Sequence, residues 1–255
     1  MGRLDGKVCV ITGAGGGMGA DAAVLFSEEG AQVCVADVNL EAAEQVASQA
    51  RDAFAVQVDV ADEGSVQAMY RAAAERYGGV DVLYNNAGIS PADDDSILET
   101  ELEAWERVQA VNTRGVFLCC KHGIPHLLER GGGSVINVAS FVALVGAATS
   151  QISYTASKGA VLSLSKELGV QFARQGIRVN ALCPGPVDTP LLRELFAKDP
   201  ERAARRLVHI PVGRFAQPEE IAAAVAFLGS DDASFITAST FVVDGGISGA
   251  YVTPL

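Results

Sequence analysis

Short apolar runs rich in β-branched residues alternate along the chain with longer segments in which apolar residues recur every three or four positions. Regular alternation of this kind specifies βαβ units, so we expect a doubly wound α/β fold with a parallel sheet covered by helices on both faces. The short runs predict seven strands, over Lys7–Thr12, Ala31–Asp37, Ala53–Val58, Val80–Asn85, Ser134–Ala139, Arg178–Cys183 and Thr240–Val243. The longer segments predict helices over Gly17–Glu29, Leu40–Ala50, Glu63–Tyr77, Leu102–Leu128, Tyr154–Arg174 and Glu219–Gly229.

One domain accounts for the whole pattern. The chain has no linker rich in proline or serine, no internal repeat and no low-complexity tract, so we predict a single domain over residues 1–255. Residues 187–216 are less regular, with proline-bounded helical pieces between loops. Because this interval follows a strand end, where ligand-covering segments are usually placed, we predict a substrate lid there.

The composition narrows the class of partner. Hydrophobic residues make up 49% of the chain and charged residues 20%, which suits a sheet buried on both sides. The 31 acidic and 19 basic residues give a net charge of −12, which repels nucleic acid and anionic lipid. The uncharged stretch over residues 131–157 is interrupted by polar residues and does not predict a membrane span. We therefore expect neither nucleic acid nor a membrane as a partner.

The cysteines and the N-terminal segment bear on the cellular compartment. The five cysteines, at positions 9, 34, 119, 120 and 183, form no CxxC pair, and most lie in apolar runs, which favours reduced, buried thiols. The charged N-terminal segment lacks the apolar stretch and cleavage site of a signal peptide. These features predict a cytoplasmic protein, and we predict no metal site.

A glycine-rich segment follows the first predicted strand and opens the first predicted helix. Glycines allow positive φ angles and let backbone N–H groups approach a pyrophosphate, while the helix N-terminus adds a partial positive charge. The strict GxGxxG spacing that begins at Gly13 is broken at Met18, so a tight turn remains an alternative. The candidate phosphate-binding residues are Gly13, Gly15, Gly16, Gly17, Met18 and Gly19.

An acidic residue, Asp37, ends the second predicted strand and is followed by Val38. A carboxylate at this place binds the adenosine ribose hydroxyls of a dinucleotide and repels a 2′-phosphate. No arginine or lysine in the glycine segment or just after Asp37 offsets that repulsion, so the sequence favours NAD over NADP. The alternative is that Asp37 caps the helix that begins near Leu40.

Tyr154 and Lys158 are four residues apart at the start of a predicted helix, which places both side chains on one face. An unperturbed tyrosine has a pKa of about 10, and a neighbouring ammonium lowers the pKa toward the range useful for acid/base chemistry. Alone, such a pair is more often a surface contact than a site.

Together the motifs resemble the short-chain dehydrogenase/reductase family over essentially the whole chain. The resemblance implies a Rossmann-type fold in which Ser140 bonds the substrate oxygen and Tyr154 exchanges its proton. It further implies that Lys158 binds the nicotinamide ribose and that Asn112 holds a helix irregularity and a water. The motifs that carry it, in order, are Thr12-Gly13-xxx-Gly17-x-Gly19, Asp59-Val60, Asn85-Asn86-Ala87-Gly88, Asn112, Ser140, Tyr154-xxx-Lys158 and Pro184-Gly185.

The same resemblance assigns further coenzyme contacts, and Val38, Tyr154 and Lys158 are also coenzyme-binding candidates. It places Asp59 and Val60 at the adenine, and Val187 with Thr189 at the carboxamide, while Asn86, Ala87 and Gly88 lie beside the ribose and Pro184 with Gly185 complete the set. Each position also has a purely structural interpretation. Asp59 could cap a strand end, Asn86 and Gly88 could form a turn, and Thr189 could be a helix N-cap.

These observations predict an NAD-dependent oxidoreductase that transfers a hydride between nicotinamide and a secondary alcohol or ketone. Two alternatives stay open: a 3-oxoacyl thioester reductase, and a non-catalytic NAD-binding regulator or scaffold. By resemblance we also expect a homotetramer, with the helices over 102–128 and 154–174 at an interface and the apolar tail over 247–255 packed on a neighbour.

The substrate region departs from the family in one respect. Ser140 and Tyr154 are 14 positions apart, one more than is usual in the family, and we place the extra residue in the loop after Gly146. We expect the catalytic roles to survive and the loop over 149–153 to differ. The residues predicted to form the walls of the substrate pocket are Phe141, Val142, Leu144, Leu191, Leu192 and Leu195. A second group could bind an anionic part of the substrate or simply form a solvated helix face, namely Arg202, Arg205, Arg206 and His209.

Overall fold

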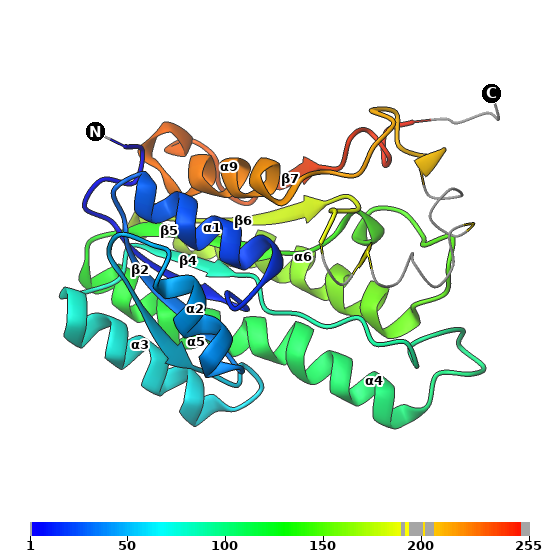
Figure 1. The fold of residues 1–255 in the computed structure, drawn as a ribbon, viewed down its shortest axis with the longest axis horizontal. Helices are drawn as coiled ribbons and strands as arrows, with labels where there is room; N and C mark the ends of the chain where they lie inside the picture. The colour runs from blue at the N-terminus through cyan, green and yellow to red at the C-terminus, as the bar shows by residue number, and fades with distance from the viewer. Residues whose placement is uncertain (1, 190–191, 194–200, 202–206, 251–255) are drawn as a thin grey trace.

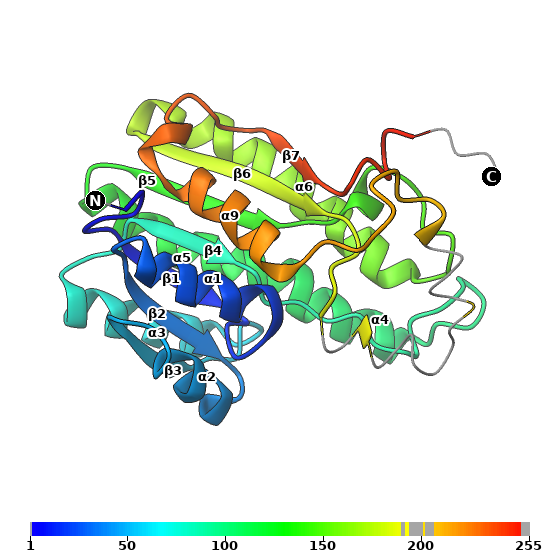
Figure 2. The ribbon, with the colours of Figure 1, turned by 45° about the horizontal axis from the view of Figure 1, so that its top comes forward.

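The computed structural model describes residues 2–189, 192–193, 201 and 207–250. Its centre is one sheet of seven parallel strands in the order β3-β2-β1-β4-β5-β6-β7 (Figures 1 and 2). The predicted fold class is therefore confirmed, and the strand boundaries differ by only one or two residues. The strands are β1 (Val8–Thr12), β2 (Gln32–Asp37), β3 (Ala53–Gln57), β4 (Val82–Asn85), β5 (Gly133–Val138), β6 (Ile177–Pro184) and β7 (Thr240–Val243).

Helices cover both faces of the sheet and divide the core into two buried layers. One layer contains α1 (Gly17–Glu28), α2 (Leu40–Ala47) and α9 (Pro218–Gly229), and the other contains α3 (Glu63–Tyr77), α5 (Gly115–Glu129) and α6 (Ile152–Phe172). The central strands are buried on both sides by these layers, and for this reason their sequences are continuous apolar runs. Short 3₁₀ helices cover Phe141–Ala143, Ala173–Gln175 and Asp231–Ala233.

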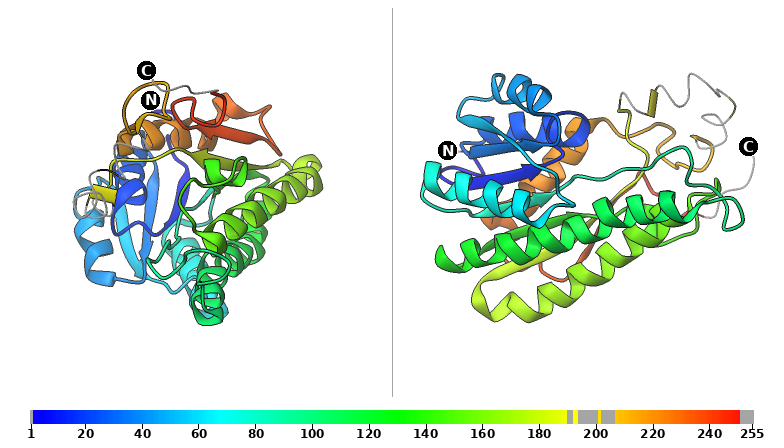
Figure 3. Two further views of the ribbon diagram at one scale, coloured as in Figure 1. Left: turned by 90° about the vertical axis from the view of Figure 1, so that its right-hand side faces the viewer. Right: turned by 90° about the horizontal axis from the view of Figure 1, so that it is seen from below.

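The long helix predicted over Leu102–Leu128 is interrupted. It consists of α4 (Leu102–Gln109), a π-helical turn η1 (Ala110–Arg114) and α5. Figure 3 shows α6 lying alongside this composite helix. The hydrophobic period could not reveal the π turn, because one extra residue hardly disturbs an apolar pattern that continues on both sides.

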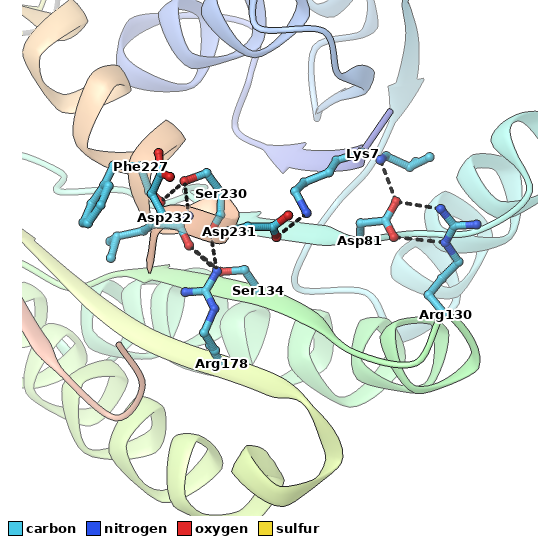
Figure 4. A network of polar contacts seen from close by, with 11 residues as sticks. Lys7, Asp81, Arg130, Ser134, Arg178, Phe227, Ser230, Asp231 and Asp232 are labelled. Atoms are coloured by element: carbon cyan, nitrogen blue, oxygen red, sulfur yellow. Dashed lines mark hydrogen bonds and ion pairs between the residues drawn. The ribbon is translucent and has the colours of Figure 1, made fainter. Parts of the chain in front are cut away.

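At the amino ends of the strands, polar contacts tie the two layers to the sheet (Figure 4). The Asp81 carboxylate accepts hydrogen bonds from Arg130 and from the Val8 N–H, and Lys7 pairs with Asp231 at 2.8 Å. Arg178 donates to the carbonyl oxygens at the end of α9. A cavity of about 570 Å³ lies among these groups. Because Lys7, Arg130 and Arg178 each have a partner already, we interpret this edge of the sheet as structural and not as a binding site.

The cysteine prediction is confirmed, since all five cysteines are buried and free. In the described part of the chain, no helix has both the length and the apolar character needed to cross a membrane. The same residues contain no cluster of histidine, cysteine or carboxylate side chains arranged to hold a metal ion.

Candidate active site

The strand order reverses direction at β1, which lies between β2 and β4. Open α/β sheets bind ligands in the crevice at such a switch point, outside the carboxyl ends of the strands. Thr12 and Asn85, the last residues of β1 and β4, are paired in the sheet. The Asn86 amide then donates to the carbonyl oxygens of Thr12 and Gly13, at 3.1 and 3.0 Å. The glycine segment and the loop after β4 are thereby fastened together.

The glycine segment has the shape of a phosphate cradle. Gly13 has a φ of +64°, and a Cβ at Gly19 would lie 2.3 Å from the Gly13 carbonyl oxygen, so neither position admits a side chain. The break in strict spacing at Met18 therefore does not matter, because Gly19 provides the close packing. Helix α1 begins at Gly17 without a side-chain cap or an acidic residue in its first turn. Its first N–H groups are available to an anion.

The buried Asn86 Oδ1 has no hydrogen-bond partner among the described residues. A buried amide oxygen without a partner costs free energy, unless a bound group donates to it. Together with the open helix N-terminus, this acceptor beside the glycine segment fits a dinucleotide that carries both a pyrophosphate and ribose hydroxyls.

Asp37 faces the glycine segment. One carboxylate oxygen accepts the Gly15 N–H at 2.9 Å, and the other accepts the Asn39 N–H at 2.9 Å. Helix α2 is capped by the side chain of Asn39, which accepts the Ala42 N–H. The alternative that Asp37 caps this helix is therefore wrong. The next residue, Val38, is exposed at the rim.

The remaining coenzyme candidates after β3 keep a structural interpretation beside the functional one. The Asp59 carboxylate accepts the Ala61 N–H at 2.9 Å and shapes the turn after β3. The buried Val60 packs against Gly115, where a Cβ would lie 2.8 Å from Val60 Cγ2. Both residues lie at the carboxyl edge of the sheet.

The segment after β6 also reaches the glycine loop. Pro184 ends β6, and the Gly185 N–H donates to Val243 at the end of β7. A Cβ at Gly17 would lie 3.6 Å from Thr189 Cγ2, so Thr189 lies beside the cradle. The Thr189 hydroxyl also accepts the N–H of Leu192 at 3.4 Å, in agreement with the N-cap interpretation.

The four predicted catalytic residues come from three elements and converge. Lys158 is 3% exposed, and its Nζ lies 5.5 Å from the centre of the Tyr154 ring. The Lys158 ammonium donates to the Val138 carbonyl at 2.8 Å. Ser140 follows β5, and its side chain is close enough to the Tyr154 phenol to lower the pKa of that phenol. The longer Ser140–Tyr154 loop thus leaves these side chains in contact.

Asn112 lies in the π turn, as the resemblance implied for a helix irregularity. Its side chain exchanges two hydrogen bonds with the backbone of Ile89, at 2.8 and 2.9 Å, and donates to Ser157 Oγ at 3.1 Å. A Cβ at Gly88 would lie 3.3 Å from both Asn112 Oδ1 and Lys158 Nζ. The loop after β4 therefore touches both the cradle and the catalytic group.

Burial dominates the titration of the site. It raises the pKa of Tyr154, and the hydrogen bond with Ser140 partly opposes that rise. The expected lowering of the tyrosine pKa by the ammonium is therefore not the net effect in this structure. Burial also lowers the pKa of Lys158 to about 8, because few groups compensate its charge.

Lys158→Met is expected to stabilise the protein at pH 7 while removing activity. A lysine pKa lowered from 10.5 to about 8 corresponds to a cost of about 3 kcal/mol. This cost is present in full below pH 8 and disappears as the pH rises toward 10.5, because the folded state releases its proton first. Loss of the bond to Val138 offsets part of the gain.

Urea unfolding at pH 7 and pH 10 measures this effect. The variant should gain about 1–3 kcal/mol at pH 7 and clearly less at pH 10. Lys166→Met, at an exposed position of the same helix, is the control and should show no such pH-dependent gain. A Lys158 variant less stable than wild type at pH 7 would show that neighbouring groups stabilise the ammonium.

Sequence reasoning missed Asp94, which is 5% exposed and accepts the N–H groups of Ser153 and Tyr154. It also missed Ser157, whose hydroxyl links Asn112 to the Tyr154 carbonyl. Asp94 lies between two other aspartates in a loop, and only its burial distinguishes it from them.

The structure describes only some of the residues predicted to form the substrate wall. Val142 is buried in the core, which is the structural interpretation, whereas Leu144 is 39% exposed and Phe141 and Leu192 are half-buried. His209 is exposed. The other wall and anion candidates lie outside the described residues, namely Leu191, Leu195, Arg202, Arg205 and Arg206, as do residues 251–255 of the apolar tail.

The ends of the 187–216 segment are pinned together by a parallel bridge between Val187 and Ala216. The Asp188 N–H donates to Ala216, and the Ala216 N–H donates to Pro186. The segment therefore leaves and re-enters the fold at one point beside the crevice. Its role as a lid remains a prediction.

Comparisons with known proteins agree with this geometry. The family model described as "Enoyl-(Acyl carrier protein) reductase" matches residues 13–248. The chain is 44% identical to cis-4-hydroxycyclohexanecarboxylate dehydrogenase of Sinomonas cyclohexanicum, over 94% of this chain and 96% of that protein. It is 43% identical to meso-2,3-butanediol dehydrogenase of Serratia marcescens, over 96% of this chain and 95% of that protein.

A solved structure gives the same result for the fold. A short-chain type dehydrogenase/reductase from Mycobacterium marinum superposes with a TM-score of 0.90 at 33% identity, covering 97% of each chain. The likeness therefore extends over nearly the whole chain in both sequence and structure.

Proposed function

Because the chain belongs to the short-chain dehydrogenase/reductase family and is an oxidoreductase acting on CH–OH donors, we propose that Tyr154 is its acid/base and NAD its coenzyme. The reaction interconverts a secondary alcohol and its ketone. The observation that carries this proposal is the placement of Tyr154 one helical turn from the buried Lys158, whose Nζ lies 5.5 Å from the centre of the tyrosine ring.

Each polar side chain has a distinct task in this proposal. Tyr154 Oη takes the proton of the alcohol or returns one to the ketone oxygen. Ser140 donates a hydrogen bond to the same oxygen, which stabilises the negative charge that develops there. Lys158 is held by Val138 and places a positive charge beside the tyrosine, which favours the phenolate when the proton leaves.

The coenzyme supplies the hydride acceptor or donor when it is bound. The glycine segment and the start of α1 fit its pyrophosphate, and Asp37 fits its adenosine ribose. Asn86, Ala87 and Gly88 fit a ribose, and Thr189, which lies beside Gly17, fits the carboxamide. These residues hold the coenzyme over the catalytic group and exclude water from it.

For the substrate we propose a neutral, mostly hydrocarbon secondary alcohol. The segment that forms the wall beside Ser140 and Tyr154 belongs to the uncharged stretch over residues 131–157. It therefore offers no fixed charge to an ionic substrate. Of the two relatives named above, the butanediol dehydrogenase is named for an uncharged alcohol, whereas the other is named for an alcohol that carries a carboxylate.

A panel of cyclic and short-chain secondary alcohols and their ketones tests this function. Each compound is assayed with NAD(H) and with NADP(H), and turnover is read at the nicotinamide absorbance. We expect NAD-linked turnover of at least one uncharged alcohol. The second candidate is a 3-oxoacyl thioester reductase, because the chain is 37% identical, over 96% of its length, to the 3-oxoacyl-[acyl-carrier-protein] reductase of Thermotoga maritima. NADPH-linked reduction of a 3-oxoacyl thioester with no alcohol oxidation would favour that candidate.

We also propose that the protein assembles into a homotetramer through α4, α5 and α6. A groove of about 740 Å³ runs over these helices and is lined by Trp105, Phe117 and Leu164 among others. Phe117 is 47% exposed there. Helix α6 carries Tyr154 and Lys158, and Asn112 lies in the π turn between α4 and α5, so a second copy in this groove would brace the catalytic residues.

Phe117→Glu is expected to halve the assembled mass or reduce it further, because a carboxylate would be buried against the apolar groove of the second copy. Light scattering coupled to gel filtration measures the mass. Phe117→Leu keeps the apolar contact and should keep the wild-type mass. An unchanged mass for Phe117→Glu would exclude this groove as an interface.

A further inference from the structure

Helix α6, which carries Tyr154 and Lys158, begins with no side-chain cap of its own, because Gln151 at its N-cap position makes no such bond. A loop far away in sequence supplies the acceptors. One oxygen of Asp94 accepts the Ser153 N–H at 2.8 Å, and the other accepts the Tyr154 N–H at 2.8 Å. The first N–H of the helix, from Ile152, donates to the Asp95 carbonyl.

The Asp94 carboxylate is 5% exposed and takes part in no salt bridge within the described residues. Its charge is stabilised instead by the positive end of a 21-residue helix and by two charge-assisted hydrogen bonds. Since one bond engages each oxygen, rotation of the carboxylate would break both. The arrangement defines where the first turn of α6 lies.

Side chains bind both backbone polar groups of Tyr154, one from outside α6 and one from within it. Its N–H is bound by Asp94, and its carbonyl accepts the Ser157 hydroxyl at 2.7 Å. The Ser157 hydroxyl in turn accepts a hydrogen bond from Asn112. The Asn112 side chain also hydrogen-bonds the backbone of Ile89, at the start of the loop that carries Asp94. The loop after β4 and the start of α6 thus form a closed circuit of hydrogen bonds around the tyrosine.

We infer that Asp94 is a positioning residue for the reaction: its carboxylate holds the Tyr154 backbone so that the phenol meets Ser140 and the substrate oxygen. This inference rests on the proposed acid/base role of Tyr154. Displacement of a reacting group by about 1 Å can lower a rate by about 100-fold. A loosened first turn would move Tyr154 while the glycine segment, which lies on other elements, stays in place.

The matched pair Asp94→Asn and Asp95→Asn tests the inference. Both variants remove one negative charge from the same loop, but Asp95 is exposed and contributes only its backbone carbonyl to α6. Asparagine at 94 keeps one acceptor and turns an NH₂ group toward a backbone N–H. We expect kcat to fall about 10- to 100-fold for Asp94→Asn and to stay near wild type for Asp95→Asn. The NADH dissociation constant, read by fluorescence, should change less than about twofold.

The assays are run well below the melting temperature of each variant, with hydrogen exchange of the peptide over 152–158 as a second readout. Faster exchange with lowered kcat supports the inference. A lowered melting temperature or faster exchange with kcat unchanged would reduce Asp94 to a structural cap and overturn it. If Asp94→Asn is too unstable, Asp94→Glu keeps two oxygens at a longer reach and should recover part of kcat. Failure of wild type to turn over any alcohol would count against the proposed function itself, before any variant is compared.

Discussion

Replacing Tyr154 with phenylalanine is expected to lower kcat by about 10²- to 10⁴-fold, which is the range that a positioned acid/base contributes. The ring remains in its packed place near Lys158, so the only loss is the hydroxyl that contacts Ser140. Because the coenzyme cradle belongs to other elements, the NADH dissociation constant should change little. Steady-state turnover of the best alcohol from the panel, together with a fluorescence titration of NADH, measures both quantities.

Tyr77→Phe is the matched control for this result. It removes an exposed hydroxyl that donates to Asp52, just before β3 and therefore at the amino edge of the sheet, away from the crevice. We expect it to leave kcat within about twofold of wild type, as is usual for a surface substitution. Normal turnover by the Tyr154 variant would show that another group moves the proton, and the proposed mechanism would be wrong.

Asp37→Ser is expected to change the ratio of kcat/KM for NAD to that for NADP by more than about 100-fold in favour of NADP. At an effective dielectric of about 20, two unit charges about 5 Å apart repel by about 3 kcal/mol, which corresponds to a factor above 100. Serine removes this repulsion of a 2′-phosphate and leaves a hydroxyl near the Gly15 N–H. Loss of the ribose contact should lower kcat/KM for NAD in addition.

Glu41→Ser is the control, since it removes the same charge from an exposed position in the neighbouring helix α2. Its effect on the coenzyme ratio should be small, because solvent and salt screen an exposed charge. Initial rates with both coenzymes at one alcohol concentration measure the ratios. A wild-type enzyme that already prefers NADP would contradict the interpretation of Asp37, whatever the variant does.

The sheet was predictable because its strands are buried on both faces. Val8–Thr12 and Val82–Asn85 consist of residues that favour strands, and their boundaries follow from flanking polar and glycine residues. The helix after residue 102 was predicted as one element because the apolar period survives the π turn at Ala110–Arg114. Only the resemblance to a family pointed to an irregularity at Asn112.

Part of the candidate site was predictable for a similar reason. Tyr154 and Lys158 are one helical turn apart, and the glycine segment lies between a strand and a helix, so local geometry alone groups them. Asp37 was singled out by its place at the end of β2, but two functions remained possible for it. The Asn39 side chain, which accepts the Ala42 N–H, excludes Asp37 as the cap of α2, and ribose binding by Asp37 stays a prediction.

The amino-acid sequence by itself determined the fold class, the order of the elements and the candidate residues whose partners are near in the chain, because these depend on short-range period and spacing. Only the tertiary structure decided which distant groups meet. Asp94 caps α6 across 60 positions of sequence, and Asn86 closes the cradle across 73. Such contacts depend on how the sheet and helices pack, so no local pattern could separate Asp94 from the aspartates on either side of it.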